Sequence, residues 1–510
     1  MLSLQGAIDL LKAHQLFEEV IINQQRHYDL SDSLKDQPIN QLTYDSRQVE
    51  AQAQALFICK GLHFNTQYLI DAIHKGAVAI LSAQEQVEIV KAQQLRALQI
   101  VVNDVQKAMA VLARGFYGNP DEQLTMIGYT GTKGKTTSVY FALHILQAQY
   151  GSNVAQLSSI DNCLNGTDFV ESHLTTPESL DLFRMLREAV DHGMKYLVME
   201  VSSQAYKKSR VYGLPFDYGV FLNISPDHIS PVEHPNFDDY LYCKSQIIEH
   251  SKQIIISREI AAYDLLIEKA RERNVPVISF GVRPGCDYQY QAEEHGYFKV
   301  KTNRDRLPRL DDQYRVMVPG NFNYANALSA MIVAAQLKIK PATIKQGLLE
   351  TVVPGRMEMM TSPNGIIACV DYAHNYLSLT ASFAFLKHEY PQSRLIVVVG
   401  SVGDKAESRR SGIAKALMEY ADIAILTSDD TYGEDQQKVI QEIHSYLSGP
   451  KPVEVLEILD REAAVRQAFA LAQPQDIVFL AAKGREQYLR VASGNQPYFG
   501  DYQLAQELTK

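Results

Sequence analysis

The sequence predicts an α/β protein built from three domains. Short apolar runs alternate with helical patterns along most of the chain, and such runs suit strands of a mostly parallel sheet that helices cover on both faces. The length of 510 residues corresponds to about three domains at roughly 150 residues each. Two turn-forming clusters, Gly118-Asn119-Pro120 and Pro354-Gly355, mark the boundaries. We therefore expect domains at 1–119, 120–354 and 355–510.

Each domain has its own strand candidates. The first domain mixes short strands with short helices, and its clearest strand is ALFIC at 55–59. The middle domain contains LTMIGYT (124–130), YLVMEVS (196–202), YGVFLNIS (218–225) and QIIIS (253–257). The last domain contains IIACVDY (366–372), LIVVVGS (395–401), IAILTS (423–428) and DIVFLAA (476–482). These later runs are continuous or nearly continuous in apolar residues, as strands buried on both faces are.

Composition and charge narrow the class of protein. The hydrophobic fraction of 46% and the charged fraction of 21% are those of a soluble globular chain. A net charge of −10 disfavours a nucleic acid or an anionic membrane as the main partner. The five cysteines are scattered without CxxC spacing, and no apolar run reaches the roughly 18 residues that span a bilayer. We expect a cytoplasmic monomer with reduced cysteines, no nucleic acid partner and no membrane insertion.

The stretch GYTGTKGKTT at 128–137 predicts a phosphate-binding loop. It follows a strand candidate and precedes the helical pattern SVYFALHILQAQ. Gly131 and Gly134 allow the backbone to curl so that its N–H groups face phosphate oxygens, and the following helix adds its positive end. Lys135 can reach terminal phosphates, and the hydroxyl of Thr136 can bind Mg²⁺.

The match of this loop to GxxxxGK[ST] is imperfect, because Tyr129 stands where the first glycine belongs. A glycine-rich turn with an exposed lysine is the alternative interpretation. The strand–loop–helix context and the GKTT ending favour nucleotide binding.

Three further residues of the middle domain carry possible chemistry. Glu200 ends a buried-looking strand, and a carboxylate there needs a partner, such as Mg²⁺ at the carboxyl edge of the sheet. A structural ion pair is the alternative for Glu200. His228, at the end of FLNISPDH, is either a ligand or a polar loop residue. Lys244, taken alone, is interpreted as a lysine on the surface of a helix.

Several motifs occur in order over nearly the whole chain. They are YDSR (44–47), TGTKGKTT (130–137), TTPES (175–179), MEVSSQA (199–205), NISPDH (223–228), GNFNYANALSA (320–330), PGRME (354–358) and DYAH (371–374). Together they resemble the Mur ligases, the ATP-dependent amino-acid-adding enzymes of peptidoglycan synthesis, and within them the branch that adds the third residue of the stem peptide. Several independent motifs in the right order are more specific than any one of them.

The resemblance implies a fold and a reaction. The first domain would be a small α/β domain that binds the UDP-sugar, the second a central P-loop ATPase domain, and the third a Rossmann-like domain that binds the incoming amino acid. The D-Glu carboxylate of UDP-MurNAc-L-Ala-D-Glu would attack the γ-phosphate of ATP to give an acyl phosphate and ADP. The amine of a free amino acid would then attack the acyl carbon and expel phosphate.

The resemblance also implies roles for residues around the nucleotide. The phosphates would be held by Thr130, Gly131, Thr132, Lys133, Gly134, Lys135, Thr136 and Thr137. Asn323 and Asn326 match asparagines at the adenine, and Arg356 and Asp371 match positions that approach the nucleotide from the third domain. Mg²⁺ would be bound by Thr136, Glu200, His228 and Lys244, where Lys244 matches the lysine that CO₂ carbamylates. Catalysis would rest on Lys135, Glu200, His228 and Lys244.

For the UDP-sugar substrate, the resemblance implies a further set. Ser46 matches the serine at the uridine, and Thr175, Thr176, Ser202 and Arg210 match contacts to the muramoyl peptide. The eight positions between Ser202 and Arg210 fit the family pattern, and a guanidinium suits an acidic peptide. Helix capping before PESLDLFRML is the alternative, or a second role, for the two threonines.

The stretch that corresponds to the amino-acid pocket is acidic. Diaminopimelate-adding relatives carry Asp-Asn-Pro-Arg, whereas this chain has Asp429-Asp430-Thr431-Tyr432, with Glu434 and Asp435 following. An acidic pocket attracts a side-chain ammonium and repels a carboxylate, so we expect L-lysine. A solvated acidic turn is the alternative.

Other residues near that pocket leave the amino acid open. Lys405 stands where many relatives have an arginine for the α-carboxylate, and Arg409 is a nearby second cation. In Ala482-Lys483-Gly484-Arg485-Glu486, Glu486 could hold an amino group, whereas Arg485 could neutralise the pocket or bind a carboxylate. Ornithine or diaminopimelate therefore stays possible.

Three rival functions remain at this point. A folylpolyglutamate-synthase-like ligase shares the loop and the modified lysine. A generic P-loop NTPase would hydrolyse ATP without a UDP-sugar, and a silent binding paralogue would keep only the fold. YDSR and MEVSSQA favour the Mur ligase over the folylpolyglutamate-synthase-like ligase. A silent paralogue is disfavoured by the intact Lys135, Thr136, Glu200, His228 and Lys244.

Overall fold

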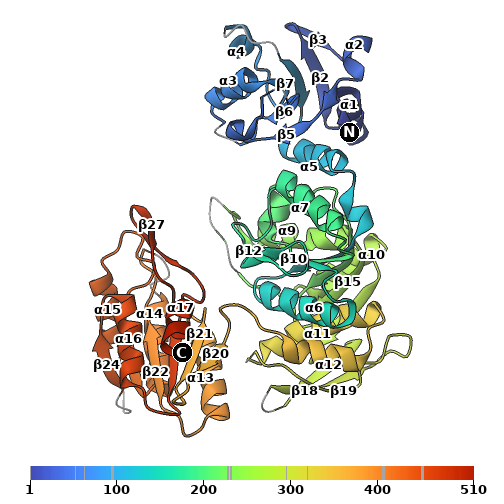
Figure 1. Ribbon diagram of the computed structural model, residues 1–510. Helices are drawn as coiled ribbons and strands as arrows, with labels where there is room; N and C mark the ends of the chain where they lie inside the picture. The colour runs from blue at the N-terminus through green and yellow to red at the C-terminus, as the bar shows by residue number, and fades with distance from the viewer. Residues whose placement is uncertain are drawn as a thin grey trace. The chain divides into compact units, whose positions relative to one another are not determined.

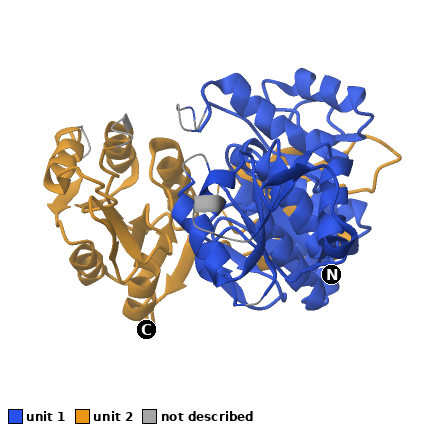
Figure 2. Cartoon of the chain, turned by 90° about the horizontal axis from the view of Figure 1, so that it is seen from above, with its two compact units in different colours: residues 1–288, 329–339 blue, residues 289–328, 340–510 orange. Residues whose placement is uncertain are grey.

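The computed structural model describes residues 2–51, 53–61, 64–92, 97–226, 229, 233–293, 296–318, 320–404, 408–448 and 453–510 (Figure 1). The chain divides into two compact units, which Figure 2 colours separately. Unit 1 comprises residues 1–288 and 329–339, and unit 2 comprises 289–328 and 340–510. The domain boundaries expected near 119 and 354 stay predictions.

Unit 1 begins with a six-stranded sheet in the order β3-β2-β8-β7-β6-β5. Its strands are β3 (Gln25–His27), β2 (Phe17–Ile22), β8 (Leu98–Val102), β7 (Ala77–Ser82), β6 (Ala55–Ile58) and β5 (Gln41–Thr43). The four strands from β5 to β8 are parallel, and β2 runs antiparallel to β8. Its helices include α1 (Leu4–Ala13), α3 (Thr66–Lys75) and α5 (Val105–Phe116). The strand predicted at 55–59 is confirmed by β6.

The second sheet of unit 1 positions the phosphate loop. Its strands lie in the order β12 (Phe169–Glu171), β11 (Asp161–Cys163), β10 (Val154–Leu157), β13 (Tyr196–Glu200), β9 (Thr125–Thr130), β14 (Phe216–Phe221), β15 (Ser251–Ser257) and β16 (Val277–Gly281). The same sheet continues through β17 (Tyr288–Ala292), β18 (Tyr297–Thr302) and β19 (Asp312–Arg315). From β10 to β16 the pairs are parallel, as the continuous apolar runs predicted. The strand expected at 218–225 ends earlier, at Phe221.

Helices cover both faces of this sheet. Helix α6 (Lys135–Tyr150) packs on β10 and β13, and α9 (Phe237–Glu249) packs on β14 and β15. Figure 1 draws α6 and α7 (Ser179–Asp191) on opposite sides of the sheet. Because β9 lies at the centre, the loop after it opens at the carboxyl edge between neighbouring strands, where ligands of open α/β sheets bind.

Unit 2 contains a second mostly parallel sheet. Its strands lie in the order β20 (Glu358–Thr361), β21 (Ile367–Asp371), β25 (Ile477–Ala481), β22 (Leu395–Val399), β23 (Ile423–Leu426) and β24 (Glu454–Glu457), and only β20 is antiparallel. One face packs against α13 (Tyr376–Glu389), α14 (Ser408–Tyr420) and α15 (Gln436–Ser445). The other packs against α16 (Arg461–Leu471) and α17 (Asp501–Leu508). This three-layer arrangement is the predicted Rossmann-like fold.

Two expectations from composition can be compared with the structure. All five cysteines are buried free thiols, as their scattered spacing predicted. Within the described ranges, no helix has both the length and the apolar character that crossing a membrane requires.

Candidate functional site

The phosphate loop connects the carboxyl end of β9 to the amino end of α6. Gly134 precedes the helix with a φ of +85°, a conformation that a side chain would strain. The ammonium of Lys135 folds back over the loop, 3.0 Å from the carbonyl oxygen of Gly131. The loop therefore presents the helix N-terminus and a lysine ammonium on one curl of backbone, as nucleotide binding needs.

A second segment holds this loop in shape. The side-chain amide of Asn223 accepts from the backbone N–H of Lys133 and donates to its carbonyl, both at 2.9 Å. The hydroxyl of Thr132 lies 3.2 Å from the carbonyl oxygen of Ser225 and 3.1 Å from the hydroxyl of Tyr240. Asn223 and Tyr240 were not singled out from the sequence, although Asn223 opens the NISPDH motif.

Glu200 lies beside the start of α6 and is only 1% exposed. One carboxylate oxygen accepts from the Thr136 hydroxyl at 2.8 Å, and from the backbone N–H and hydroxyl of Ser159 at 2.8 and 3.0 Å. Among the described residues Glu200 forms no ion pair, so the described part of the chain gives no support to the structural ion pair. A buried carboxylate and a hydroxyl in contact form an oxygen donor set of the kind that Mg²⁺ prefers.

Lys244 is buried in α9 and is not a surface lysine. Its side chain is 2% exposed, and its ammonium donates to the carbonyl oxygen of Gly131 at 2.8 Å. The same ammonium lies 4.8 Å from the centre of the Tyr240 ring. Lys244 and Lys135 thus both contact the carbonyl of Gly131. His228 lies outside the described residues.

The predicted peptide-binding residues meet at the end of β13. The Thr176 hydroxyl donates to the Glu200 carbonyl at 3.0 Å and lies 3.3 Å from the Ser202 hydroxyl. Helix capping by Thr175 or Thr176 is wrong, because Glu178 is the N-cap of α7 and makes no side-chain capping bond. Thr176 lies two residues before the cap position, and its hydroxyl instead bonds the backbone at the end of β13.

Arg210 already has a carboxylate partner in the chain. Its guanidinium donates to Glu178 at 2.7 and 3.0 Å and to the Thr176 carbonyl at 3.2 Å. Lys60, which follows β6, binds the other oxygen of Glu178 at 2.8 Å. Burial raises the pKa of Glu178, but the two cations outweigh it and hold that pKa below the ordinary value. Lys60 was missed, because a lone lysine after a strand carries no motif.

Ser46, the predicted uridine contact, is 6% exposed in a short 3₁₀ turn. The ammonium of Lys75 from α3 donates to its carbonyl oxygen at 3.0 Å. Nearby, the Tyr44 hydroxyl donates to Asp181 of α7 at 2.5 Å, and the Lys60 ammonium lies 4.3 Å from the centre of the Tyr44 ring. The YDSR segment is therefore tied to the start of α7.

Unit 2 contains the predicted adenine contacts and two more nucleotide positions. Asn326 donates to the side-chain oxygen of Asn323 at 2.9 Å, and both are buried in α11 (Phe322–Gln336). Asp371 ends β21, accepts from two backbone N–H groups at 2.6 and 2.8 Å, and has a pKa raised by burial. Arg356 lies with its guanidinium 5.1 Å from the centre of the Tyr372 ring.

The acidic stretch after β23 is buried, which removes the solvated turn as an explanation. Asp429 is 4% exposed and Asp430 is 8% exposed. Lys483 bridges Asp430 at 2.8 Å and Glu486 at 2.5 Å. Burial raises the pKa values of Asp429 and Glu486, while the Lys483 ammonium opposes the rise. Three carboxyl groups thus surround one internal ammonium.

Other charges near this pocket are already paired. Glu434 binds the buried guanidinium of Arg410 at 2.6 Å, and Arg485 binds Glu358 at 2.9 Å. The Arg485 guanidinium is therefore directed to β20 rather than to the carboxylates of the pocket. Asp435 caps α15. The acidic character comes from Asp429, Asp430 and Glu486, and less from the rest of the motif than the sequence indicated.

The remaining predicted residues of this pocket have modest roles in the structure. Tyr432 adopts a φ of +51°, and its backbone N–H donates to the carbonyl oxygen of Arg490 at 3.0 Å. The Thr431 hydroxyl lies 3.5 Å from the same carbonyl. Arg409 is half-buried in α14, and Lys405 lies outside the described residues.

Comparison with known proteins shows the family of this chain. Residues 129–334 match the Mur ligase middle domain, and residues 355–484 match the Mur ligase, glutamate ligase domain. A relative from Enterococcus faecalis, named UDP-N-acetylmuramoyl-L-alanyl-D-glutamate--L-lysine ligase, is 45% identical over 99% of this chain and 98% of its own length. The chain belongs to the Mur ligase family.

A second relative and a solved structure are also similar to this Mur ligase. The UDP-N-acetylmuramyl-tripeptide synthetase of Ligilactobacillus salivarius is 43% identical over 100% of this chain and 99% of its own length. A solved UDP-N-acetylmuramoyl-L-alanyl-D-glutamate--2,6-diaminopimelate ligase has a TM-score of 0.68 at 22% identity, covering 94% of this chain and 96% of that one. At that identity the solved structure supports the three-domain fold alone.

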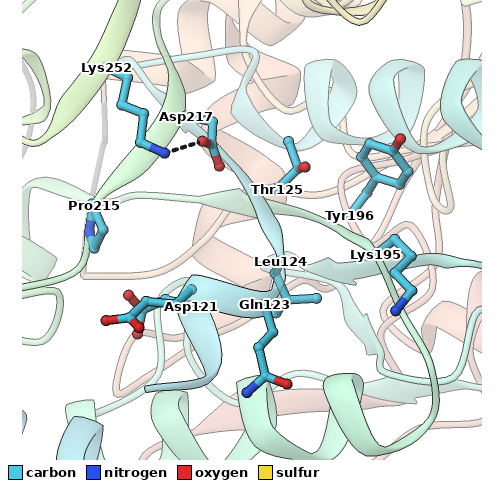
Figure 3. Close-up of a pocket in the computed structure, with 10 residues that line it drawn as sticks. Asp121, Gln123, Leu124, Thr125, Lys195, Tyr196, Pro215, Asp217 and Lys252 are labelled. Atoms are coloured by element: carbon cyan, nitrogen blue, oxygen red, sulfur yellow. Dashed lines mark hydrogen bonds and ion pairs between the residues drawn. The ribbon is translucent and has the colours of Figure 1, made fainter. Parts of the chain in front are cut away.

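A cavity in this Mur ligase lies away from the phosphate loop. It has a volume of about 570 Å³ and is lined by residues at the starts of β9, β13, β14 and β15, among them Thr125, Tyr196, Asp217 and Lys252 (Figure 3). The phosphate loop follows the opposite, carboxyl end of β9. Asp217 and Lys252 are paired at 2.8 Å, and Asp217 also accepts from the backbone of Met126, so these charges are accounted for structurally.

Proposed function

We propose that this Mur ligase joins L-lysine to the D-Glu carboxylate of UDP-MurNAc-L-Ala-D-Glu while ATP is converted to ADP and phosphate. The observation that carries the proposal is the cluster of three acidic side chains, the buried Asp429 and Asp430 and the half-buried Glu486, beside the ammonium of Lys483. The name of the 45% identical relative supports the same amino acid. Such a pocket favours an ammonium over a carboxylate at the end of the side chain.

The reaction takes place in two steps. A D-Glu carboxylate oxygen bonds to the γ-phosphorus of ATP, the bond to the β-phosphate oxygen breaks, and ADP leaves. The neutral α-amine of lysine then bonds to the acyl carbon, the bond to the phosphate oxygen breaks, and the amine loses a proton. The first step brings a carboxylate against a polyphosphate, so cations must offset their repulsion, and Lys135 of the phosphate loop supplies one.

We propose Thr136 and Glu200 as protein ligands of Mg²⁺. Their oxygens are 2.8 Å apart, and the buried Glu200 carboxylate has hydroxyl and backbone N–H donors but no described cation. When bound there, Mg²⁺ would neutralise charge on the phosphates of ATP. Ser159 orients the carboxylate through two donors to one of its oxygens.

We propose that Lys244 is used as a carbamate. Carbamylation by CO₂ makes a carbon–nitrogen bond, releases a proton and turns an ammonium into an anionic oxygen group. Lys244 is buried, and its place beside Gly131 puts the group at the phosphate loop. His228 remains a predicted neighbour of this site.

The UDP-sugar and nucleotide contacts are proposed on the same basis. Ser46, Thr175, Thr176, Ser202 and Arg210 would bind UDP-MurNAc-L-Ala-D-Glu. Thr176 and Ser202 share one hydrogen-bonded cluster, which supports a joint role. Asn323, Asn326, Arg356 and Asp371 would serve the nucleotide, and Lys405 or Arg409 the α-carboxylate of the amino acid.

Phosphate release from ATP tests this function. Release is expected only when UDP-MurNAc-L-Ala-D-Glu and L-lysine are both present, and the product should be the UDP-sugar extended by one lysyl residue, as read by mass spectrometry. Phosphate release that depends on neither the UDP-sugar nor the amino acid would indicate a generic P-loop NTPase. Release that requires a folate or a UDP-tripeptide would assign it to another ligase of the superfamily.

A further inference from the structure

Lys483 connects two turns at the carboxyl edge of the unit 2 sheet. It follows β25, and its ammonium reaches Asp430, which follows β23, at 2.8 Å, and Glu486 of its own turn at 2.5 Å. Strand β22 lies between β25 and β23. The lysine side chain thus spans the end of the middle strand, where open α/β sheets bind ligands.

The backbone around Lys483 directs its side chain into the pocket. Ala482 has a φ of +81° and Gly484 a φ of +53°, so the turn bends sharply on both sides of the lysine. A Cβ at Gly484 would lie 2.3 Å from the Tyr372 ring, which leaves this position to glycine. Tyr488 adds an aromatic ring 5.2 Å from the ammonium.

The contacts of Lys483 leave one oxygen of Glu486 for a ligand, whereas the second oxygen of Asp430 lies 3.9 Å from the Arg490 guanidinium. Asp430 also accepts from the backbone N–H of Arg490 at 3.0 Å, which fixes one of its oxygens further. Within the described part of the chain, no donor bonds the second oxygen of Glu486. The Lys483 ammonium therefore bonds one oxygen of Asp430 and one of Glu486, and so orients both carboxylates.

The charge balance of the pocket depends on the same residue. Asp429, Asp430 and Glu486 would carry three negative charges. Lys483, with its side chain 1% exposed, bonds two of these carboxylates, and the guanidinium of Arg490 lies 3.9 Å from Asp430. Arg461, the other buried cation near Asp429, is paired with Asp501 at 2.6 Å. Without Lys483, three neighbouring acidic groups would repel each other and rearrange.

We propose that Lys483 is a positioning residue that holds Asp430 and Glu486 in the arrangement that receives the side-chain ammonium of the incoming diamine, and that it sets selectivity for the length of that diamine. This role rests on the proposed function and deepens it. The internal ammonium holds the acidic oxygens in fixed positions, so a diamine whose side-chain ammonium does not reach them binds less well.

The test is steady-state phosphate release by the full-length Lys483→Met enzyme, with each substrate varied in turn. The KM for L-lysine should rise about tenfold or more, and the preference for L-lysine over L-ornithine should fall about threefold. The KM values for ATP and for UDP-MurNAc-L-Ala-D-Glu should stay within about twofold of wild type. Lys438→Met, an exposed lysine of α15, is the matched control and should change none of them.

Two outcomes would overturn the role of Lys483. One is an unchanged KM for L-lysine, and the other is a parallel rise in all three KM values, which a general loss of structure would produce. If wild type itself shows no lysine-dependent release, the proposed function fails, and the role of Lys483 fails with it. If wild type shows lysine-dependent release and Lys483→Met has wild-type KM values, only the role of Lys483 fails and the proposed function stands.

A second variant covers the case in which Lys483→Met does not fold. Lys483→Arg keeps the charge but replaces a compact donor with a wide planar fork, so it should fold and raise the KM for L-lysine about threefold. A wild-type KM for L-lysine in Lys483→Arg, together with an unfolded Lys483→Met, would assign Lys483 a purely structural role.

Discussion

Glu200 and Lys244 are both almost fully buried beside the phosphate loop, and that burial gives each a chemical task. Glu200 gathers hydroxyl and backbone donors, while Lys244 contacts the loop carbonyl at Gly131. Burying a charged carboxylate costs free energy unless donors or a cation offset its charge, which supports the proposed Mg²⁺ site at Glu200. At the residue scale these contacts are the basis of the proposed Mg²⁺ and nucleotide site.

Lys244→Ala is expected to lower kcat about 100-fold, because the carbamate oxygens would be lost from the loop. A short carboxylic acid such as acetate should restore part of the rate by supplying an oxygen anion in the vacated space. Lys252→Ala removes an exposed lysine of the same unit and should neither lose activity nor respond to acetate. Full activity of Lys244→Ala without added acid would contradict the proposal that Lys244 acts as a carbamate.

Thr136→Ala should lower kcat about 100-fold and raise the Mg²⁺ concentration needed for half-maximal rate. Ser159→Ala is the matched control, because its hydroxyl bonds the same oxygen of Glu200 but is not a proposed metal ligand. We expect a loss of about tenfold or less for that control. Equal losses, with equal Mg²⁺ dependence, would contradict Thr136 as a ligand.

At the residue scale, the sequence motifs pointed to the residues with possible chemistry but not to the residues that contact them. Glu200 and Asp429 stand out in the sequence because charged residues end apolar strands. Ser159, Lys60 and Lys483 do not stand out, since they meet Glu200, Glu178 and Asp430 only after the chain folds. Distance in sequence is the physical reason, as Lys60 and Glu178 show.

At the scale of elements, Glu178 ties three segments together. It sits at the start of α7 and binds Lys60 from the end of β6 and Arg210 from the turn after α8 (Ser203–Lys207). Removing a buried anion leaves both cations without their charge partner, which is more damaging than losing an exposed ion pair. The network therefore stabilises the predicted peptide-binding segment.

Glu178→Gln should lower the thermal unfolding midpoint by about 2–5 °C near neutral pH. Although burial raises the pKa of Glu178, Lys60 and Arg210 hold it below the ordinary 4.5. A lowered folded-state pKa stabilises the fold above the ordinary value, and this contribution is lost as the pH falls below 4.5 through the folded pKa. The difference between wild type and variant should thus shrink in acid.

Midpoints of wild type and Glu178→Gln measured across pH 7 to about pH 3 check this expectation. Glu188→Gln, whose partner Arg184 is exposed, should shift the midpoint by about 1 °C or less at any pH. A constant difference between wild type and Glu178→Gln at every pH would show that the charge of Glu178 is not what stabilises the segment.

Element prediction succeeded where periodicity and burial agree. The apolar runs at 124–130, 395–401 and 476–482 became β9, β22 and β25, because strands buried on both faces need apolar side chains at every position. The run at 218–225 overreached, since its last residues form the loop that holds Lys133. Polar turn residues with tertiary roles are not separable from strand ends by pattern alone.

At the scale of the whole molecule, chemistry is divided between the two units. The phosphate loop, Glu200 and Lys244 belong to unit 1, whereas the acidic pocket and Lys483 belong to unit 2. Family motifs that run through both units made the function predictable from the sequence. The choice of amino acid rests on fewer residues. In Asp429-Asp430-Thr431-Tyr432, only the two aspartates match the Asp-Asp-Pro-Asn motif that the family resemblance gives for L-lysine-adding relatives.

The most direct test of the central claim is the ratio of kcat/KM for L-lysine to that for L-norleucine, which has the same chain length but no side-chain ammonium. An acidic pocket that binds an ammonium should favour L-lysine by about 1,000-fold or more, with meso-diaminopimelate also poor because of its second carboxylate. Similar values for L-lysine and L-norleucine, or a preference for meso-diaminopimelate, would contradict the assignment of Asp429, Asp430 and Glu486 as the ammonium site.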